Sequence, residues 1–157
     1  MKHPPYGPLM IVLSALLLNA CATPHTQFPL QKYVPVSRAL EPLGELHLSN
    51  TVMQLAALDG EMRLQYVGQM PEAAGEDLAG ASVYRVKNWQ PYFKQNLGRK
   101  AYCEEPPRWV AVNSETGAPA WSREITVALL AVDEWANYTA GSEHRACVAG
   151  KYVRTRE

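Results

Sequence analysis

Hydrophobic and polar residues alternate over several stretches after residue 43, and this period of two is typical of β-strands. The alternating runs 51–58 and 62–66 lie on either side of Asp59-Gly60. Alternation around Asp-Gly is a strong short-range signal for a β-hairpin. Residues 124–132, EITVALLAV, form the most apolar run outside the N-terminal region and predict a central strand.

Shorter strands are expected at 83–86, 102–103, 108–112 and 145–153. The aromatic and leucine residues between 89 and 97 recur at helical spacing, which predicts a short amphipathic helix there. Asp133 can cap a single helical turn, and residues 70–82 have the Pro, Gly and acidic content of a long exposed loop. These elements predict a β-rich α+β domain with a mostly antiparallel sheet, one or two short helices and one disulfide.

The N-terminal region has a different pattern, because residues 9–18 are apolar and carry no charge. This run is too short for a transmembrane helix, which needs about 17–25 residues, but it has the length of the core of a secretory signal. It ends in Leu18-Asn19-Ala20-Cys21. Ordinary signal peptidase prefers a small residue three positions before the cut, so Leu18 disfavours ordinary cleavage before Cys21.

Leu-x-Ala-Cys at 18–21 resembles the lipobox of bacterial lipoproteins. The resemblance implies that residues 1–20 are removed as a signal peptide and that Cys21 carries a diacylglycerol and becomes the first mature residue. It places the protein in the bacterial cell envelope, and Ala22 in place of Asp favours the outer membrane, facing the periplasm. The alternative is that Ala20-Cys21-Ala22 is an A-x-A cleavage site, which would release a soluble exported protein.

Four prolines between residues 21 and 42 disfavour a regular helix and predict an extended tether. At the rise of a polyproline helix, this tether could hold the domain up to about 60 Å from the lipid. Phe28, Leu30 and Tyr33 indicate that part of it packs on the domain. The predicted organisation is therefore a signal peptide at 1–20, a tether at 21–42 and a β-rich periplasmic domain at 43–157.

The remaining cysteines, Cys103 and Cys147, are predicted to form a disulfide in the oxidising periplasm. A redox pair or metal ligation is the alternative. The whole chain has 15 basic and 15 acidic side chains, and removal of residues 1–20 takes away one lysine and no acid. This balance argues against a general nucleic-acid binder.

The sequence contains no serine elbow, no closely spaced zinc ligands and no glycine-rich phosphate loop. His25, His47 and His144 are interpreted as structural or solvated histidines. The adjacent carboxylates at 76–77, 104–105 and 133–134 are interpreted as solvated surface. We therefore predict no catalytic residue, metal, cofactor or small-molecule substrate.

A basic cluster without an acidic residue lies between positions 85 and 100. Its members are Arg85, Lys87, Lys94, Arg99 and Lys100. It is a candidate surface for an anion or a partner protein, and a solvated helix face is the alternative.

Together these patterns predict a lipid-anchored envelope protein that binds or scaffolds another envelope protein without catalysis. An inhibitor or immunity-type lipoprotein, which would block a toxin or a lytic enzyme, is the second hypothesis. An enzyme is the third, and a cleft that gathers a carboxylate with His47 or His144 would favour it.

Overall fold

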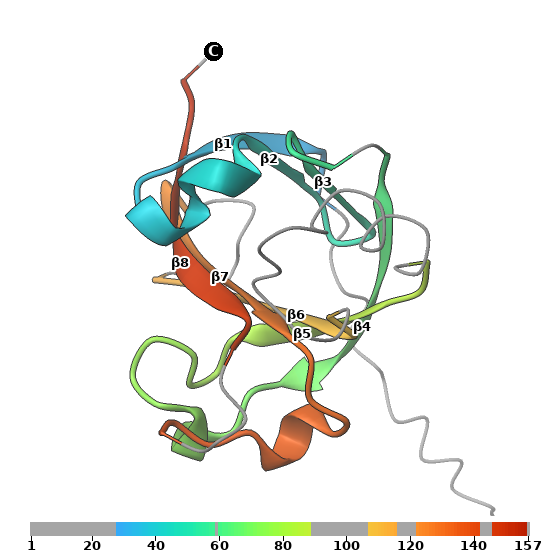
Figure 1. Ribbon diagram of the computed structural model, residues 1–157, viewed down its shortest axis with the longest axis vertical. Helices are drawn as coiled ribbons and strands as arrows, with labels where there is room; N and C mark the ends of the chain where they lie inside the picture. Colours follow the sequence, from blue (N-terminus) through green and yellow to red (C-terminus); the bar gives the residue numbers. More distant parts are fainter. Residues whose placement is uncertain (1–27, 59, 89–106, 116–121, 142–145, 157) are drawn as a thin grey trace, which may run out of the picture.

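The computed structural model of the chain describes residues 28–58, 60–88, 107–115, 122–141 and 146–156. These residues form a closed barrel in which each strand pairs antiparallel with the next, and β1 pairs with β8 to close the ring (Figure 1). The strands are β1 (Gln31–Pro35), β2 (Leu46–Leu48), β3 (Val52–Leu55), β4 (Met62–Gln69), β5 (Ser82–Val86), β6 (Trp109–Ser114), β7 (Glu124–Leu130) and β8 (Val148–Arg154).

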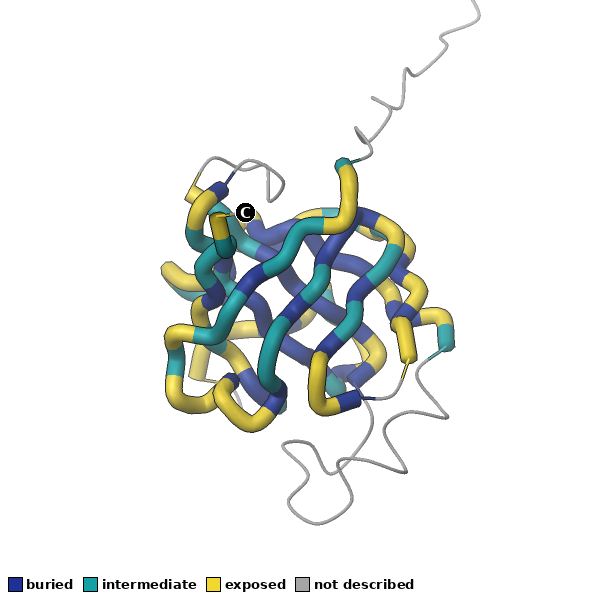
Figure 2. The backbone as a smooth tube through the Cα atoms, turned by 90° about the horizontal axis from the view of Figure 1, so that it is seen from above, coloured by how far each residue is buried: buried dark blue, intermediate teal, exposed yellow. Residues whose placement is uncertain are grey.

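The barrel interior is filled by the inward-facing apolar side chains of the strands. Along β7, for example, Ile125, Val127 and Leu129 belong to the interior cluster. Figure 2 shows buried positions alternating with more exposed ones along several strands. The three largest fully buried side chains are tyrosines of this interior: Tyr33, Tyr84 and Tyr152. An eight-stranded barrel has an interior about wide enough for side chains to fill or for one small ligand.

A second apolar cluster lies outside the barrel, on the outer face of β5, β6 and β7. It is covered by the β4–β5 loop with the 3₁₀ helix η2 (Glu72–Ala74) and by the segment after β7 with the 3₁₀ helix η4 (Trp135–Asn137). Both segments lie on the same side of the barrel (Figure 1). The indole Nε1 of Trp109 donates a hydrogen bond of 2.8 Å to the Val132 carbonyl. This bond ties the covering segment to the sheet.

A third 3₁₀ helix, η1 (Arg38–Leu43), connects β1 to β2 and buries Leu40 and Leu43 in the interior cluster. It packs against Gly150 of β8. A Cβ atom at Gly150 would lie 2.9 Å from Leu40 Cδ1 and 2.7 Å from Ser37 Cβ. The missing side chain at Gly150 therefore provides the space in which η1 docks.

The α+β prediction is wrong, because the described residues form a closed antiparallel barrel whose only helices are 3₁₀ helices. The turn predicted after Asp133 is η4, which is too short for an α-helix. The helix predicted at 89–97 lies outside the described residues. The loop at 70–82 is not simply exposed, since Met70 and Leu78 are buried in the outer cluster. Its apolar residues are spaced irregularly, and periodicity could not identify them.

The barrel begins at Gln31, inside the segment 21–42 that the sequence predicts as a tether. Tyr33 pairs with Leu46 of β2 and with Arg154 of β8, so this segment supplies a full barrel strand. Pro35 lies at the end of β1 and Pro42 in the 3₁₀ helix η1, so neither proline interrupts a ladder. The extended conformation that prolines favour is also the conformation of a strand.

Local predictions were more accurate. The hairpin around Asp59-Gly60 is confirmed by the pairing of Val52 with Arg63 and of Met53 with Met62, although Asp59 itself is outside the described residues. The strand predicted at 124–132 is confirmed as β7, which lies between β6 and β8. Both features depend on short apolar patterns that a sequence shows directly.

Candidate functional site

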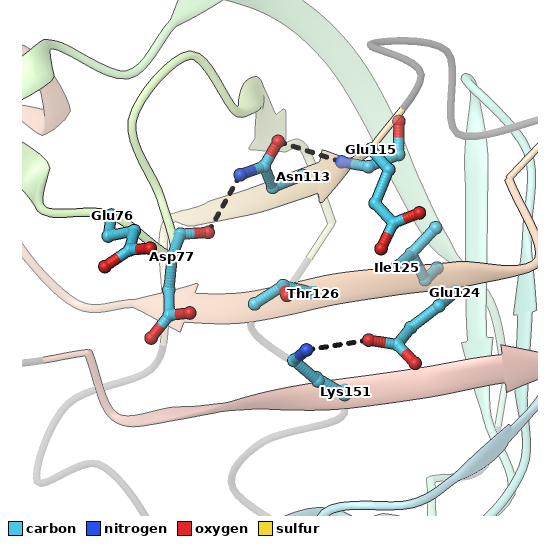
Figure 3. Close-up of a pocket in the computed structure, with 9 residues that line it drawn as sticks. Glu76, Asp77, Asn113, Glu115, Glu124, Ile125, Thr126 and Lys151 are labelled. Atoms are coloured by element: carbon cyan, nitrogen blue, oxygen red, sulfur yellow. Dashed lines mark hydrogen bonds and ion pairs between the residues drawn. The ribbon is translucent and has the colours of Figure 1, made fainter.

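A polar hollow of about 230 Å³ lies on the outer face of β6, β7 and β8 (Figure 3). Its floor is a row of three side chains in register across the sheet. Asn113 of β6 pairs with Thr126 of β7, and Thr126 pairs with Lys151 of β8. Alternation places these residues on the outer face, because their neighbours Val112 and Val127 face the interior.

Four carboxylates surround this floor. Glu76 and Asp77 come from the β4–β5 loop, Glu115 follows β6, and Glu124 is the first residue of β7. Figure 3 shows them around Thr126. We call these four carboxylates and the floor residues Asn113, Thr126 and Lys151 the acidic hollow.

The β4–β5 loop is fixed against the sheet by the Asn113 side chain. Asn113 Nδ2 donates a hydrogen bond of 2.9 Å to the Asp77 carbonyl, and Asn113 Oδ1 accepts one of 2.9 Å from the Ser114 backbone N–H. One amide therefore links the loop to the end of β6. This link positions the Glu76 and Asp77 side chains at the rim of the hollow.

The charge of the acidic hollow is strongly unbalanced. Its one ammonium, Lys151 Nζ, lies 2.7 Å from Glu124 Oε1. The hydrogen bond that Lys151 donates to Glu124 raises the pKa of Lys151, and the charges of Asp77 and Glu115 raise it further. Within the described part of the chain, the carboxylates of Glu76, Asp77 and Glu115 form no ion pair. Three negative charges therefore remain uncompensated around a polar floor.

A second hollow, of about 400 Å³, lies beside the β3–β4 turn. Its polar residues are Glu45, His47 and Gln54. Glu45 forms an ion pair of 2.7 Å with Lys32, and the hydrogen bond from Lys32 lowers the pKa of the Glu45 carboxyl. His47 Nε2 lies 3.8 Å from Glu45 Oε1. Such a histidine–carboxylate pair in a cleft is the feature that would favour the enzyme hypothesis.

Three observations make this second hollow a weak catalytic candidate. The His47 and Glu45 side chains are 39% and 43% exposed, so water solvates both. The described residues that line the hollow include no hydroxyl or thiol nucleophile, the others being Leu55, Ala56, Leu58 and Gly60. Among the described residues no group of three or more His, Cys, Asp or Glu side chains could hold a metal ion. The pair could exchange a proton, but no described residue beside it supplies a nucleophile for a covalent step.

The predicted basic cluster is described only in part. Arg85 lies on β5 with its guanidinium carbon 5.6 Å from the centroid of the Trp109 ring, and Lys87 is exposed just after β5. Lys94, Arg99 and Lys100 lie outside the described residues. The cluster as an anion or partner site stays a prediction.

Cys21 and Cys103 also lie outside the described residues. Cys147 is half-buried beside the interior cluster and is disulfide-bonded, and its backbone N–H donates a hydrogen bond of 2.8 Å to the Leu129 carbonyl. The pairing of Cys147 with Cys103 stays a prediction, as does lipidation of Cys21.

Sequence reasoning missed the acidic hollow. It interpreted Glu76-Asp77 as solvated surface. The structure places these two residues at the rim of a hollow whose floor includes Lys151, which lies beside Glu124. The relevant signal is the register of β6, β7 and β8, and alternation within one strand cannot reveal which residues of three strands align.

Comparison with protein-family models, with curated proteins and with solved structures gives no match. In the described part of the chain, no helix has the length and apolar character needed to cross a membrane. The function is therefore inferred from the contacts and charges of the described residues.

Proposed function

We propose that this chain is a lipid-anchored protein of the outer membrane, facing the periplasm, whose barrel binds another envelope protein without catalysis. Its contact surface is the acidic hollow. The lipobox-like sequence at 18–21 supports the anchor. The observation that carries the binding role is the set of three uncompensated carboxylates, Glu76, Asp77 and Glu115, around a polar floor. Such a surface suits a partner that presents Lys or Arg side chains.

The floor adds specificity to this attraction. Thr126 and Asn113 are held in place by the strand register and by the hydrogen bond from Asn113 to the loop. Lys151 is neutralised by Glu124 and therefore does not repel a cationic group strongly. A guanidinium, with five donors in a planar fork, could reach carboxylate and hydroxyl acceptors together.

The anchor restricts where this surface can lie. Between Cys21 and β1 there are the nine residues 22–30, which reach at most about 30 Å when fully extended. This is about half of the reach of about 60 Å that a tether over residues 21–42 would have. In an antiparallel ring, the start of β1, the end of β6 and the start of β7 lie at the same end of the barrel. Glu115 and Glu124 therefore lie at the end where the tether enters.

Charge neutralisation tests the binding surface. The triple variant Glu76→Gln, Asp77→Asn, Glu115→Gln removes the uncompensated charges but keeps the side-chain shapes. Fluorescence anisotropy with a labelled oligo-arginine peptide is expected to show affinity lower by about 3- to 150-fold at low salt, since each of the three exposed ion pairs contributes about 0.2–1 kcal/mol.

The matched control neutralises three exposed carboxylates elsewhere, Glu41, Glu61 and Glu134, to Gln. It changes the net charge equally and is expected to leave most of the affinity intact. Equal losses in both triples would show that only net charge matters and would refute a localised site. Pull-down from the native envelope then separates the two partner classes: an envelope complex supports scaffolding, whereas a single secreted enzyme supports the inhibitor hypothesis.

A further inference from the structure

Among the described residues, two buried hydroxyl groups have no hydrogen-bond partner, those of Tyr152 and Ser114. Tyr152 is 0% exposed, and its hydroxyl meets no donor or acceptor among the described residues. The Ser114 hydroxyl oxygen is likewise buried without a partner. Burial removes the hydrogen bonds that these groups make to water in the unfolded chain, so an unpaired hydroxyl is costly and rare.

These two hydroxyls belong to the same cross-strand row. Ser114 of β6 pairs with Ile125 of β7, and Ile125 pairs with Tyr152 of β8. Ile125 and Tyr152 belong to the interior cluster. Ser114 is two residues from the inward-facing Val112, so alternation also directs it inward. Two strand spacings of about 4.8 Å separate the backbones of Ser114 and Tyr152, a span comparable with the length of a tyrosine side chain.

The hydroxyl of another interior tyrosine, Tyr84, does have a hydrogen-bond partner. Tyr84 is equally buried, but its hydroxyl hydrogen-bonds to Ser82, and its ring packs edge-on against Tyr66 with centroids 5.8 Å apart. The interior therefore pairs one tyrosine hydroxyl with a serine and leaves the Tyr152 hydroxyl and the Ser114 hydroxyl each without a protein partner. Burial raises the pKa of Tyr152, so its hydroxyl remains a proton donor at neutral pH.

We propose that Tyr152 and Ser114 form an internal binding site for a small uncharged hydrogen-bonding guest, which accepts a hydrogen bond from the Tyr152 hydroxyl. The guest is uncharged because the surrounding side chains, Ile125 and Val127 among them, are apolar, and a charge buried there would be strongly disfavoured. A tightly held water and a small polar organic molecule share this chemistry. Ser114 and Ile125 also line the acidic hollow, but the internal site uses none of its four carboxylates.

The sign of a stability change tests the site. Tyr152→Phe removes only the hydroxyl. If a guest is bound, the variant loses its hydrogen bond, and the melting temperature is expected to fall by about 3–8 °C. If the hydroxyl is unpaired, its removal relieves a cost, and the melting temperature rises. A rise, or no change, overturns the proposal.

A double-mutant cycle asks whether both hydroxyls hold the same guest. Ser114→Ala is expected to lower the melting temperature less in the Tyr152→Phe background than in the wild type, because the guest is already lost. Equal effects in both backgrounds contradict a shared site. This comparison remains informative even when each single variant is only mildly destabilised.

Two further measurements on the full-length protein from its native host distinguish the sources. Native mass spectrometry that shows an added mass, lost after unfolding and refolding and missing from Tyr152→Phe, identifies an organic guest. Without such a mass, a long-lived internal water seen by water relaxation dispersion, and missing from Tyr152→Phe, identifies water. If neither signal is found, the site is empty and the proposal fails.

Discussion

Replacing Gly150 by alanine tests how the 3₁₀ helix η1 docks on the barrel. The backbone at Gly150 is ordinary for a strand, so the substitution adds only a methyl group. That methyl would lie 2.7 Å from Ser37 Cβ and 2.9 Å from Leu40 Cδ1. Leu40 can adjust its side chain, but Ser37 cannot move easily, because its Oγ accepts a hydrogen bond of 2.8 Å from the Lys151 backbone N–H.

The expected cost follows from this geometry. Adding a methyl group to a packed interior usually costs about 1–3 kcal/mol, because side chains or backbone must shift. The contact with Ser37 Cβ is shorter than Cβ atoms tolerate, which places Gly150→Ala in the upper half of this range, at about 2–3 kcal/mol. With a urea slope of about 2 kcal/mol per molar, the unfolding midpoint falls by roughly 1 M.

Urea denaturation followed by tryptophan fluorescence measures this shift. Ala149→Ser, at the exposed neighbouring position, is the control and should change stability by less than about 0.5 kcal/mol. In a Leu40→Ala background, Gly150→Ala should cost less, because one of the two contacts is gone. A Gly150→Ala protein as stable as the wild type would refute the docking of η1 in this position.

Two further predictions concern titration and covalent structure. Burial raises the pKa values of the interior tyrosines Tyr33, Tyr84 and Tyr152 above their ordinary value of 10.0. Their contribution to stability is therefore fully present below pH 10 and is lost as the pH rises through their folded-state pKa values. A urea unfolding midpoint that stays constant up to about pH 12 would contradict this. Peptide mapping without reductant should find Cys103 linked to Cys147, and Cys103→Ser should lower stability by about 4 kcal/mol less any strain, whereas a free thiol at Cys103 would exclude the pairing.

The parts of the fold that sequence could predict are those with local signals. The β3–β4 hairpin follows from Asp59-Gly60 and alternation, and β7 follows from a continuous apolar run. Closure of the barrel has no such signal. It depends on the pairing of Pro35 with Tyr152, residues at opposite ends of the domain, and the prolines around β1 pointed to a tether instead.

The acidic hollow could not be predicted from the sequence for the same reason. Each residue of the acidic hollow is ordinary within its own segment, and Glu76-Asp77 taken alone is typical of a solvated loop. The site arises only when the register aligns Asn113, Thr126 and Lys151 and the Asn113 amide holds the loop. Charge patterns along the chain could not show which carboxylates would remain without a cation.

The most direct test of a lipid-anchored role is mass spectrometry of the mature N-terminus from the native host. The expected result is an N-terminal peptide that begins at Cys21 and carries the mass of a diacylglycerol, and a Cys21→Ser variant should lose both this mass and its attachment to the membrane. An unmodified N-terminus at Thr23, on a protein released by osmotic shock, would contradict the anchor.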